Sequence, residues 1–194
     1  MTLTTEARAM DRAPPALAEP ETVTGFWRPL GPAIWFGQDP GFDRRFRDGF
    51  LALHEAAAEG RLARWAATAE GALALCVLLD QFPRNAFRGT PRVFATDPEA
   101  RAVARAAIER GLDEALEGWM PLFLYLPFGH SEDPADQALA VRLCERLPEP
   151  SPSHARRHRA IVARFGRFPH RNSILGRRTT PEEQAYLDGG GFAG

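Results

Sequence analysis

Apolar residues recur at helical spacing along most of the chain. The clearest helix is expected between Asp39, which suits an N-cap before Pro40, and Gly60, which suits a stop. Its apolar stripe consists of Phe42, Phe46, Phe50, Leu53 and Ala57. His54 lies just outside this stripe, so we expect a solvated or edge histidine rather than a metal ligand. The pattern predicts an amphipathic helix with one buried face.

Two strongly apolar segments follow. Thr68 suits the N-cap of a helix whose body, GALALCVLLDQF, is apolar on every side, which predicts a helix at the centre of the fold. The segment LEGWMPLFLYLPF is similarly apolar and is expected to end at Pro127. Before both, residues 25–40 mix aromatic side chains with glycines and prolines. This mixture predicts an aromatic plug in irregular backbone, with Trp27 and Trp35 in the core.

Capping signals mark the remaining helices. They predict one helix from Asp97 to Gly111 and a second from Ser131 to about Leu147. A third helix is expected from Ser153 to Phe165. A short last helix is expected to begin at a capping box of Thr180, Pro181 and Glu183.

The fold class follows from what the pattern lacks. Valine and isoleucine together number ten, no long stretch alternates with period two, and helix starts recur every 20 to 35 residues. We therefore predict an all-α fold of antiparallel helix pairs joined by short turns. Residues 1–20 are expected to form a flexible N-terminal tail, and residues 21–190 a single helical domain.

Composition excludes several classes of function. All 24 basic residues are arginines, so the chain can form neither a lysine Schiff base with pyridoxal phosphate nor a Walker A loop. The net charge of −1 gives no overall attraction to nucleic acids or membranes. No apolar run reaches the ~20 residues that span a bilayer. We expect a cytoplasmic protein without a cofactor, in which Cys76 and Cys144 are buried thiols.

One segment carries a strong local charge. Between Ser151 and Pro181 the chain has eight arginines, three histidines and no acidic residue. On a helix, His158 falls in the middle of the apolar stripe, so we expect it to be at least partly buried. A buried histidine needs a hydrogen-bond partner, and Asp80 and Glu132 are the acidic candidates.

Three motifs carry a family resemblance: LDQFPRNAFRG at residues 79–89, PFGHSED at 127–133 and HRAIVARFGRFPHRNSILGR at 158–177. Together with WFGQDPGFD and TTPEEQAYL, they resemble the bacterial family of domain of unknown function 924. The resemblance implies a tetratricopeptide-like, right-handed superhelical array and no established activity or catalytic residue. Gly129 departs from the family pattern, which usually has an acidic residue there.

Two hypotheses explain these motifs. In the first, the motifs are structural: their arginines pair with carboxylates and helix ends inside the fold. We favour this explanation for each residue taken singly. In the second, they line a site for an anion, because guanidinium groups match phosphate and carboxylate. The candidate residues are Asp80, Arg84, Asn85, Arg88, His130, Glu132, His158, Arg164, Arg167, His170, Arg171, Asn172 and Arg177.

Chemistry at other positions is less favoured. His154 and His158 have the spacing of zinc ligands, but HARRH lacks the glutamate of a metalloprotease helix and no third ligand follows, so we expect no metal. Ser131 suits a cap better than a nucleophile. FPRN at 82–85 and FPHRN at 168–172 echo each other, and each proline is expected to break a helix so that Arg and Asn enter a turn.

The sequence thus favours a helical protein that binds a peptide, a partner protein or a small anion through arginine and histidine. The alternative is an enzyme that acts on a phosphorylated or carboxylated small molecule, with histidine as general acid or base and arginine as clamp. Nucleic-acid binding is the weakest hypothesis, because the arginines alternate with positions expected to be buried. The pattern carries no signal for oligomeric state.

Overall fold

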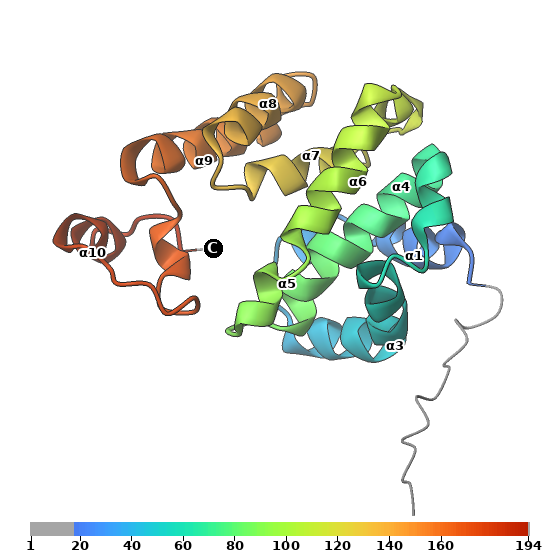
Figure 1. Ribbon diagram of the computed structural model, residues 1–194, viewed down its shortest axis with the longest axis horizontal. Coiled ribbons are helices and arrows are strands. Elements are labelled where there is room, and N and C mark those ends of the chain that lie inside the picture. Colours follow the sequence, from blue (N-terminus) through green and yellow to red (C-terminus); the bar gives the residue numbers. More distant parts are fainter. Residues whose placement is uncertain (1–17, 194) are drawn as a thin grey trace, which may run out of the picture.

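The computed structural model describes residues 18–193, which are helical and contain no strand (Figure 1). This part of the chain is therefore all-α, as predicted. The tail expected over residues 1–20 lies almost entirely outside the described residues. The α-helices are α1 Pro20–Trp27, α2 Pro32–Trp35, α3 Pro40–Ala58, α4 Ala69–Cys76, α5 Phe82–Ala86, α6 Asp97–Glu109, α7 Leu122–Gly129, α8 Pro134–Cys144, α9 Ser151–Phe165 and α10 Pro181–Asp188.

The centre of the fold is the apolar helix predicted after Thr68. Helix α4 continues through a π-helical turn at Val77–Gln81 directly into α5. Every residue from 71 to 83 is buried. Helices α1, α6 and α7 pack around α4, and α3 packs against α5 (Figure 1). An all-round apolar helix can be stable in water only if other helices cover each of its sides, and these four helices do so.

The aromatic segment at residues 25–40 is more helical than predicted. It forms α1, a 3₁₀ turn at Arg28–Leu30 and α2. Trp27 and Trp35 are buried, as expected, with ring centroids 6.4 Å apart and the edge of Phe123 against both. The prolines do not prevent helix here because Pro29 and Pro32 stand in the first turn of the 3₁₀ turn and of α2, where a missing N–H costs little.

Several helix ends agree with the sequence. Asp39 accepts hydrogen bonds from the N–H groups of Gly41 and Phe42, and Thr68 accepts one from Gly71. Thr180 and Glu183 form the predicted capping box, with both reciprocal hydrogen bonds. The stripe of α3 is buried from Phe42 to Ala57, as predicted.

Other local predictions were wrong. Asp97 is the first residue of α6 rather than its cap, and its carboxylate pairs with Arg84. Asp133, not Ser131, caps α8 and accepts the N–H of Ala135. Helix α7 continues through Pro127 to Gly129, because burial of the surrounding apolar residues outweighs one lost backbone hydrogen bond.

Two further corrections concern α5 and His54. Pro83 does not break the helix, because the π turn before it places the proline in the first turn of α5, so Arg84 and Asn85 stay helical. His54 is buried rather than at an edge. Its Nδ1 lies 2.9 Å from the carbonyl oxygen of Leu78, and its ring stacks on Phe82 with centroids 4.8 Å apart.

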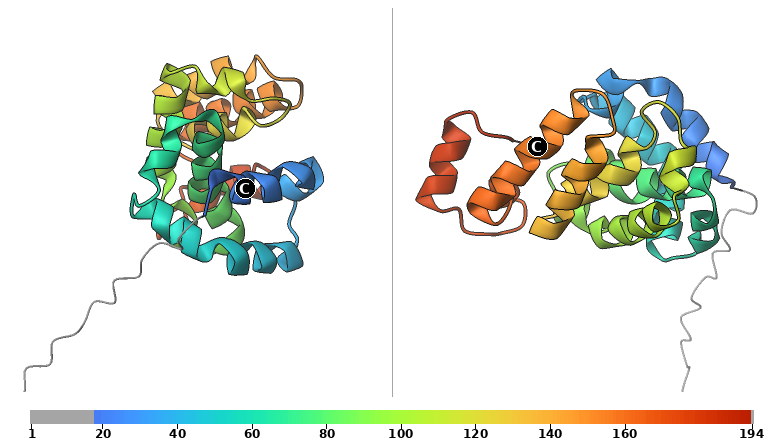
Figure 2. Two further views of the ribbon diagram at one scale, coloured as in Figure 1. Left: turned by 90° about the vertical axis from the view of Figure 1, so that its right-hand side faces the viewer. Right: turned by 90° about the horizontal axis from the view of Figure 1, so that it is seen from above.

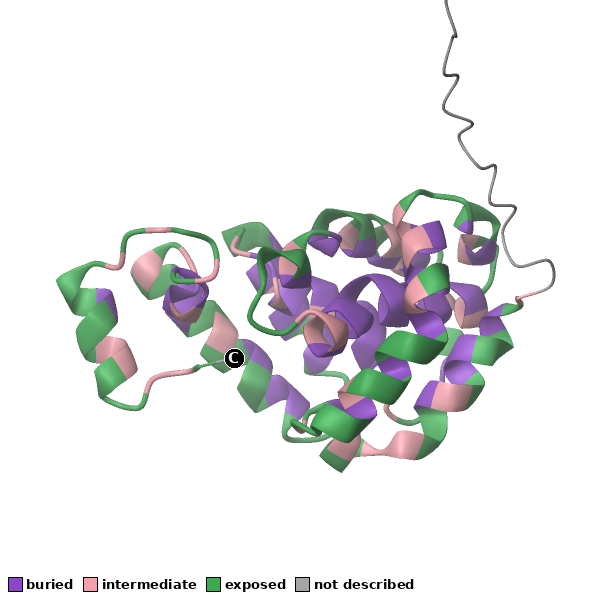
Figure 3. Cartoon of the chain, turned by 90° about the horizontal axis from the view of Figure 1, so that it is seen from below, coloured by how far each residue is buried: buried purple, intermediate pink, exposed green. Residues whose placement is uncertain are grey.

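The C-terminal part of the chain has a small core of its own. Helix α9 packs along α8 (Figure 2), while the chain from residue 166 onward turns back beneath α9 in the view of Figure 1. Ile161, Val162 and Phe168 form this core with Phe165, Tyr186 and Phe192 around them. Figure 3 shows that the surface of α10 is mostly exposed, whereas the central helices are buried. This second core places the arginine-rich segment beside the end of α7.

Candidate functional site

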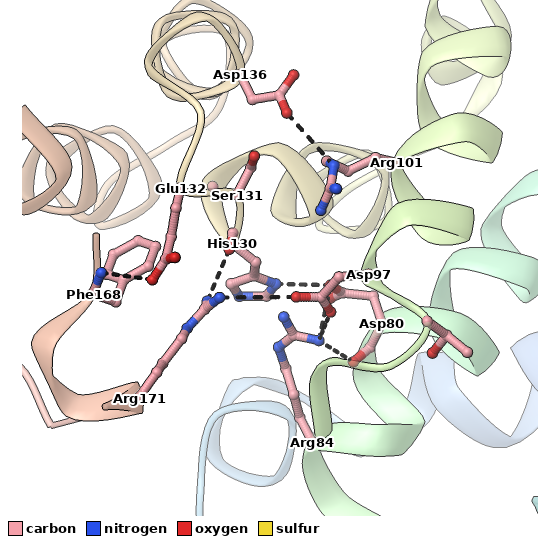
Figure 4. A network of polar contacts seen from close by, with 12 residues as sticks. Asp80, Arg84, Asp97, Arg101, His130, Ser131, Glu132, Asp136, Phe168 and Arg171 are labelled. Atoms are coloured by element: carbon pink, nitrogen blue, oxygen red, sulfur yellow. Dashed lines mark hydrogen bonds and ion pairs between the residues drawn. The ribbon is translucent and has the colours of Figure 1, made fainter. Parts of the chain in front are cut away.

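Asp80 lies at the centre of a group of charged side chains (Figure 4). Its side chain is fully buried and projects from the π-helical turn between α4 and α5. Such a turn widens the helix by one residue and is frequent at functional sites. The Asp80 carboxylate accepts a hydrogen bond from the Gln81 amide at 2.6 Å. The apolar central helix thus carries one buried carboxylate, which must be balanced by partners from other elements.

His130 supplies the first partner. It follows the last residue of α7, and its Nδ1 lies 2.8 Å from Oδ1 of Asp80. Because a carboxylate only accepts, Nδ1 carries the proton and the other ring nitrogen, Nε2, presents a lone pair. The His130 side chain is 15% exposed, so this dyad lies at the edge of the core rather than inside it.

Two arginines flank the dyad. Nη1 of Arg84 lies 3.1 Å from the Asp80 carboxylate and 3.0 Å from the carboxylate of Asp97, at the start of α6. Arg171, from the 3₁₀ turn at Pro169–Arg171, donates from Nη2 to the His130 carbonyl oxygen at 2.8 Å. Its Nη1 is 3.9 Å from Asp97. We call Asp80, Arg84, Asp97, His130 and Arg171 the dyad centre.

The two arginines keep N–H groups that the fold does not use. Nη2 of Arg84 and Nε of Arg171 are buried, and neither has an acceptor among the described residues. Figure 4 shows both guanidinium groups reaching toward His130 from different elements. Arg171 is 7% exposed and also lies over the rings of Phe94 and Phe168. Two aromatic rings therefore contact the guanidinium group of Arg171.

The protonation states follow from burial and from these charges. Burial raises the pKa of Asp80, but the charge of Arg84 and the hydrogen bonds from His130 and Gln81 outweigh it and lower the pKa to about 2. Burial, together with the charge of Arg84, lowers the pKa of His130. At neutral pH the dyad is therefore a carboxylate beside a neutral imidazole.

The candidate residues predicted from the sequence separate into distinct groups. Asp80, Arg84, His130 and Arg171 come together in the dyad centre. Glu132 accepts the N–H of Phe168 and two hydrogen bonds from Arg177, at 2.7 and 3.0 Å. This ion pair ties the end of α7 to the C-terminal core, and it stands next to the centre.

Other candidates lie elsewhere and have structural partners. Arg167 forms a bidentate pair with Glu183, which also accepts a hydrogen bond from Asn172. Arg164 pairs with Glu182 at the surface. Arg88 pairs with Asp43 and with Asn85 on the side of α3, away from the dyad centre. For these residues the structure provides acidic or amide partners within the chain.

The expected partners of His158 were wrong. His158 is partly buried, as predicted, but its Nδ1 lies 3.1 Å from the carbonyl oxygen of Gly129. Asp80 pairs with His130 instead, and Glu132 pairs with Arg177. A backbone carbonyl at the end of α7 is closer to α9 than either carboxylate. Burial lowers the pKa of His158 to about 3 and that of His170 to about 4, so both are neutral.

An apolar cavity of about 190 Å³ lies on the other side of the α7 C-terminus. Trp119, Leu122, Tyr125 and Leu126 line it together with Ala155 of α9, and His158 and Gly129 close the side toward the dyad centre. The exposed ring of Phe36 stands at this cavity. The end of α7 therefore separates an apolar space from a charged centre.

Sequence reasoning missed one member of the centre, Asp97, and the amide of Gln81 that donates to Asp80. Asp97 was taken for a helix cap, and Gln81 was taken for part of an apolar helix. A carboxylate before Pro98 carries the signal of a cap, and nothing in the chain links residue 97 to residues 84 and 171. Only packing of α6 against the π-helical turn brings Asp97 to the arginines.

Fold and site together define an all-helical protein with a buried Asp–His dyad between two arginines. The family described as "Bacterial protein of unknown function (DUF924)" matches residues 23–191, and the chain belongs to this family. A solved structure of a protein of unknown function from Agrobacterium tumefaciens is 50% identical, with a TM-score of 0.86, over 88% of this chain and 97% of that one. No curated protein matches the sequence. None of the helices in residues 18–193 combines the length and apolar character that crossing a membrane requires.

Proposed function

We propose that the protein binds a small anion, a carboxylate or a phosphate, at the dyad centre. The observation that carries this proposal is the pair of buried donors without acceptors, Nη2 of Arg84 and Nε of Arg171. A buried N–H that lacks an acceptor costs about 1 to 3 kcal/mol, so native proteins rarely keep one without a reason. An anion that offers two oxygens beside His130 would accept from both arginines.

The charge balance of the centre supports a single small anion. Asp80 and Asp97 offset Arg84 and Arg171, and His130 is neutral, so the centre without a ligand has no net charge. A multiply charged surface such as nucleic acid would find little to attract it there. A peptide or a partner protein, which the sequence also allowed, has less support, because the unused donors are buried and not on an open face.

Titration with inorganic phosphate, sulfate and malonate tests this proposal. Calorimetry should show saturable binding to the wild type, and the anion should raise its melting temperature. A ligand at a hundred times its Kd adds about 2.7 kcal/mol to the free energy of unfolding. Arg84→Gln and Arg171→Gln should lose the response, whereas Arg164→Gln should keep it, because Arg164 pairs with Glu182 on the surface.

The binding proposal is wrong if none of the three anions binds the wild type at millimolar concentration. It is also wrong if Arg84→Gln and Arg164→Gln respond equally, since the anion then binds elsewhere.

An enzyme is the second candidate function, and the Asp80–His130 hydrogen bond favours it. A buried carboxylate that fixes the Nδ1–H tautomer leaves Nε2 as a base, and Nε2 donates to and accepts from no described residue. With Arg84 and Arg171 as the clamp, the substrate would be a phosphorylated or carboxylated small molecule. Ser131 is not needed as a nucleophile, because its Oγ accepts the N–H of Asp133 in a turn.

A screen with 4-nitrophenyl phosphate and 4-nitrophenyl esters addresses this second candidate. Any activity found should fall by about 10² to 10⁴ in His130→Gln, the usual contribution of a general acid or base. His154→Gln is the control, because His154 is exposed on α9. Activity that survives in His130→Gln would show that the dyad is not the catalytic group.

Two broader features belong to the same proposal. We propose a cytoplasmic location, which is supported by the free, buried thiols of Cys76 and Cys144. We also propose that the helix pairs follow a tetratricopeptide-like, right-handed superhelix. The packing of α7 on α8 and of α8 on α9 supports this arrangement.

A further inference from the structure

The chain folds back on itself after α10. Gly189, Gly190 and Gly191 follow the helix, and Gly190 has a φ of +78°, in the left-handed region that favours glycine. The N–H of Gly191 donates to the Tyr186 carbonyl at 2.9 Å, and the N–H of Phe192 donates to the Tyr186 hydroxyl at 3.0 Å. We call residues 189–193 the C-terminal strap.

The strap places the ring of Phe192 among other rings. Its centroid lies 4.8 Å from that of His158 and 5.0 Å from that of His170, with the Phe168 ring at 6.4 Å. The guanidinium carbon of Arg157 lies 5.1 Å from the Phe192 ring. We call the space between His158, Phe168 and His170 the ring seat. Imidazole, phenyl and guanidinium groups form a surface that suits a flat aromatic ring.

The ring seat adjoins the dyad centre. The ring of His158 is 6.3 Å from that of His130, and the guanidinium carbon of Arg171 is 4.6 Å from the ring of Phe168. His158 and Phe168 therefore line the ring seat, and each also lies beside a member of the dyad centre. Nδ1 of His170 is buried beside Phe192 and has no acceptor or donor among residues 18–193.

The attachment of the strap is weak compared with that of the helices. Gly189 and Gly190 donate to the carbonyl oxygens of Ala185 and Leu187 at the end of α10. Beyond these helix-end bonds, the strap backbone makes two hydrogen bonds, both to Tyr186, and its side-chain contacts come from one ring. Three successive glycines can change their backbone dihedrals at little steric cost. The ring of Phe192 can thus leave the ring seat while α10 and its capping box stay in place.

We propose that Phe192 occupies the position of an aromatic ring carried by the ligand, so that the strap swings out when the ligand binds. The ligand is then an anion that bears an aromatic ring, an aryl phosphate or an aryl carboxylate. Its anionic group rests on the function proposed above, whereas its ring rests on the ring seat alone. The strap also lowers the affinity of the wild type, because only the open fraction of the protein can bind.

Three probes separate the two parts of the ligand: inorganic phosphate, phenyl phosphate and benzyl alcohol. Phe192→Ala should bind phenyl phosphate at least about tenfold more tightly than the wild type, since the closed strap no longer competes. Its affinity for phosphate should be unchanged. Phe192→Tyr, which keeps the ring, should behave as the wild type does. Benzyl alcohol should move the imidazole resonances of His170 in Phe192→Ala but not in the wild type.

The readout at His170 identifies the site, because His170 does not line the apolar cavity beside α7. The wild type gives a further measurement that needs no variant to fold. Phenyl phosphate should increase hydrogen exchange at the amides of Gly191 and Phe192, which are bonded to Tyr186 in the closed strap, and phosphate should not.

The outcomes distinguish the two proposals. If phosphate and phenyl phosphate bind equally to all variants and the His170 resonances do not move with benzyl alcohol, the ring seat is refuted and the anion site stands. If phosphate does not bind but benzyl alcohol moves His170 in Phe192→Ala alone, the ring seat stands and the anion site is refuted. Unchanged exchange at Gly191 and Phe192 in saturating phenyl phosphate refutes the opening of the strap.

Discussion

Replacement of Asp80 by asparagine tests whether the buried carboxylate holds the dyad centre together. The variant removes a charge that contacts Arg84 and His130 but keeps the size of the side chain and one acceptor oxygen. The pKa of Asp80 is lowered from 3.8 to about 2, and at about 1.4 kcal/mol per pH unit this corresponds to about 2 kcal/mol in favour of the charged form.

The known cost of breaking a buried ion pair gives a similar value for the loss in free energy of unfolding. Removal of one partner from a buried ion pair costs about 3 to 5 kcal/mol, because the other charge is left without compensation. Here Asp97 still pairs with Arg84, which reduces the cost. We therefore expect Asp80→Asn to lower the free energy of unfolding by about 2 to 4 kcal/mol. In a chain of this size each kcal/mol lowers the melting temperature by about 2 to 4 °C.

Urea unfolding at several pH values is the assay. A carboxyl group whose pKa is lowered by folding stabilises the protein above its unfolded pKa, and this contribution is lost as the pH falls through the folded value. The difference between the wild type and Asp80→Asn should thus be complete above about pH 5 and shrink between about pH 4 and pH 2. Asp43→Asn is the control, because Asp43 pairs with the exposed Arg88 and should cost less than about 1 kcal/mol. A cost in Asp80→Asn no larger than in the control, or one that does not change with pH, would refute the argument.

Three further predictions concern stability. Burial lowers the pKa of His158 from 6.5 to about 3, so the unfolded chain takes up a proton at a higher pH than the folded protein does. The free energy of unfolding should therefore decline as the pH falls from about 6.5 toward 3, and His158→Gln should flatten this decline in urea unfolding. Ala155→Leu should fill part of the 190 Å³ cavity and raise the free energy of unfolding by about 0.5 to 2 kcal/mol. Ala160→Leu, on the exposed side of α9, is the control and should not raise it; equal effects of the two variants would contradict the cavity. Thr180→Ala should cost about 1 kcal/mol by removing the cap of α10, and a neutral result in thermal unfolding would contradict the capping box.

Much of the secondary structure could be predicted from the sequence because its causes are local. The spacing of Phe42, Phe46 and Phe50 defines the buried face of α3 without reference to any other helix. Asp39 and Thr180 cap their helices through contacts within four residues. The absence of lysine and the burial of the central apolar helix also follow from the chain alone.

Predictions from the local sequence were wrong where contacts between two elements fix the conformation or the partner of a residue. Pro127 and Pro83 were expected to end helices, but the surrounding core keeps both in helical backbone. His54 was expected at an edge, and the carbonyl of Leu78, in the π-helical turn, gives it a buried partner instead. The partner of His54 lies 24 residues away along the chain, so a local pattern could not indicate it.

The dyad centre shows the same division most clearly. The chain alone indicates which charged groups must find partners: arginines and histidines in three motifs, with Asp80 and Glu132 as acidic candidates. The pairs themselves depend on how the helices pack, because α6, α7 and the turn after α9 bring Asp97, His130 and Arg171 to the π-helical turn from distant positions. A charged side chain in a core takes the partner that packing brings within about 3 Å, and no periodicity in the chain encodes that distance.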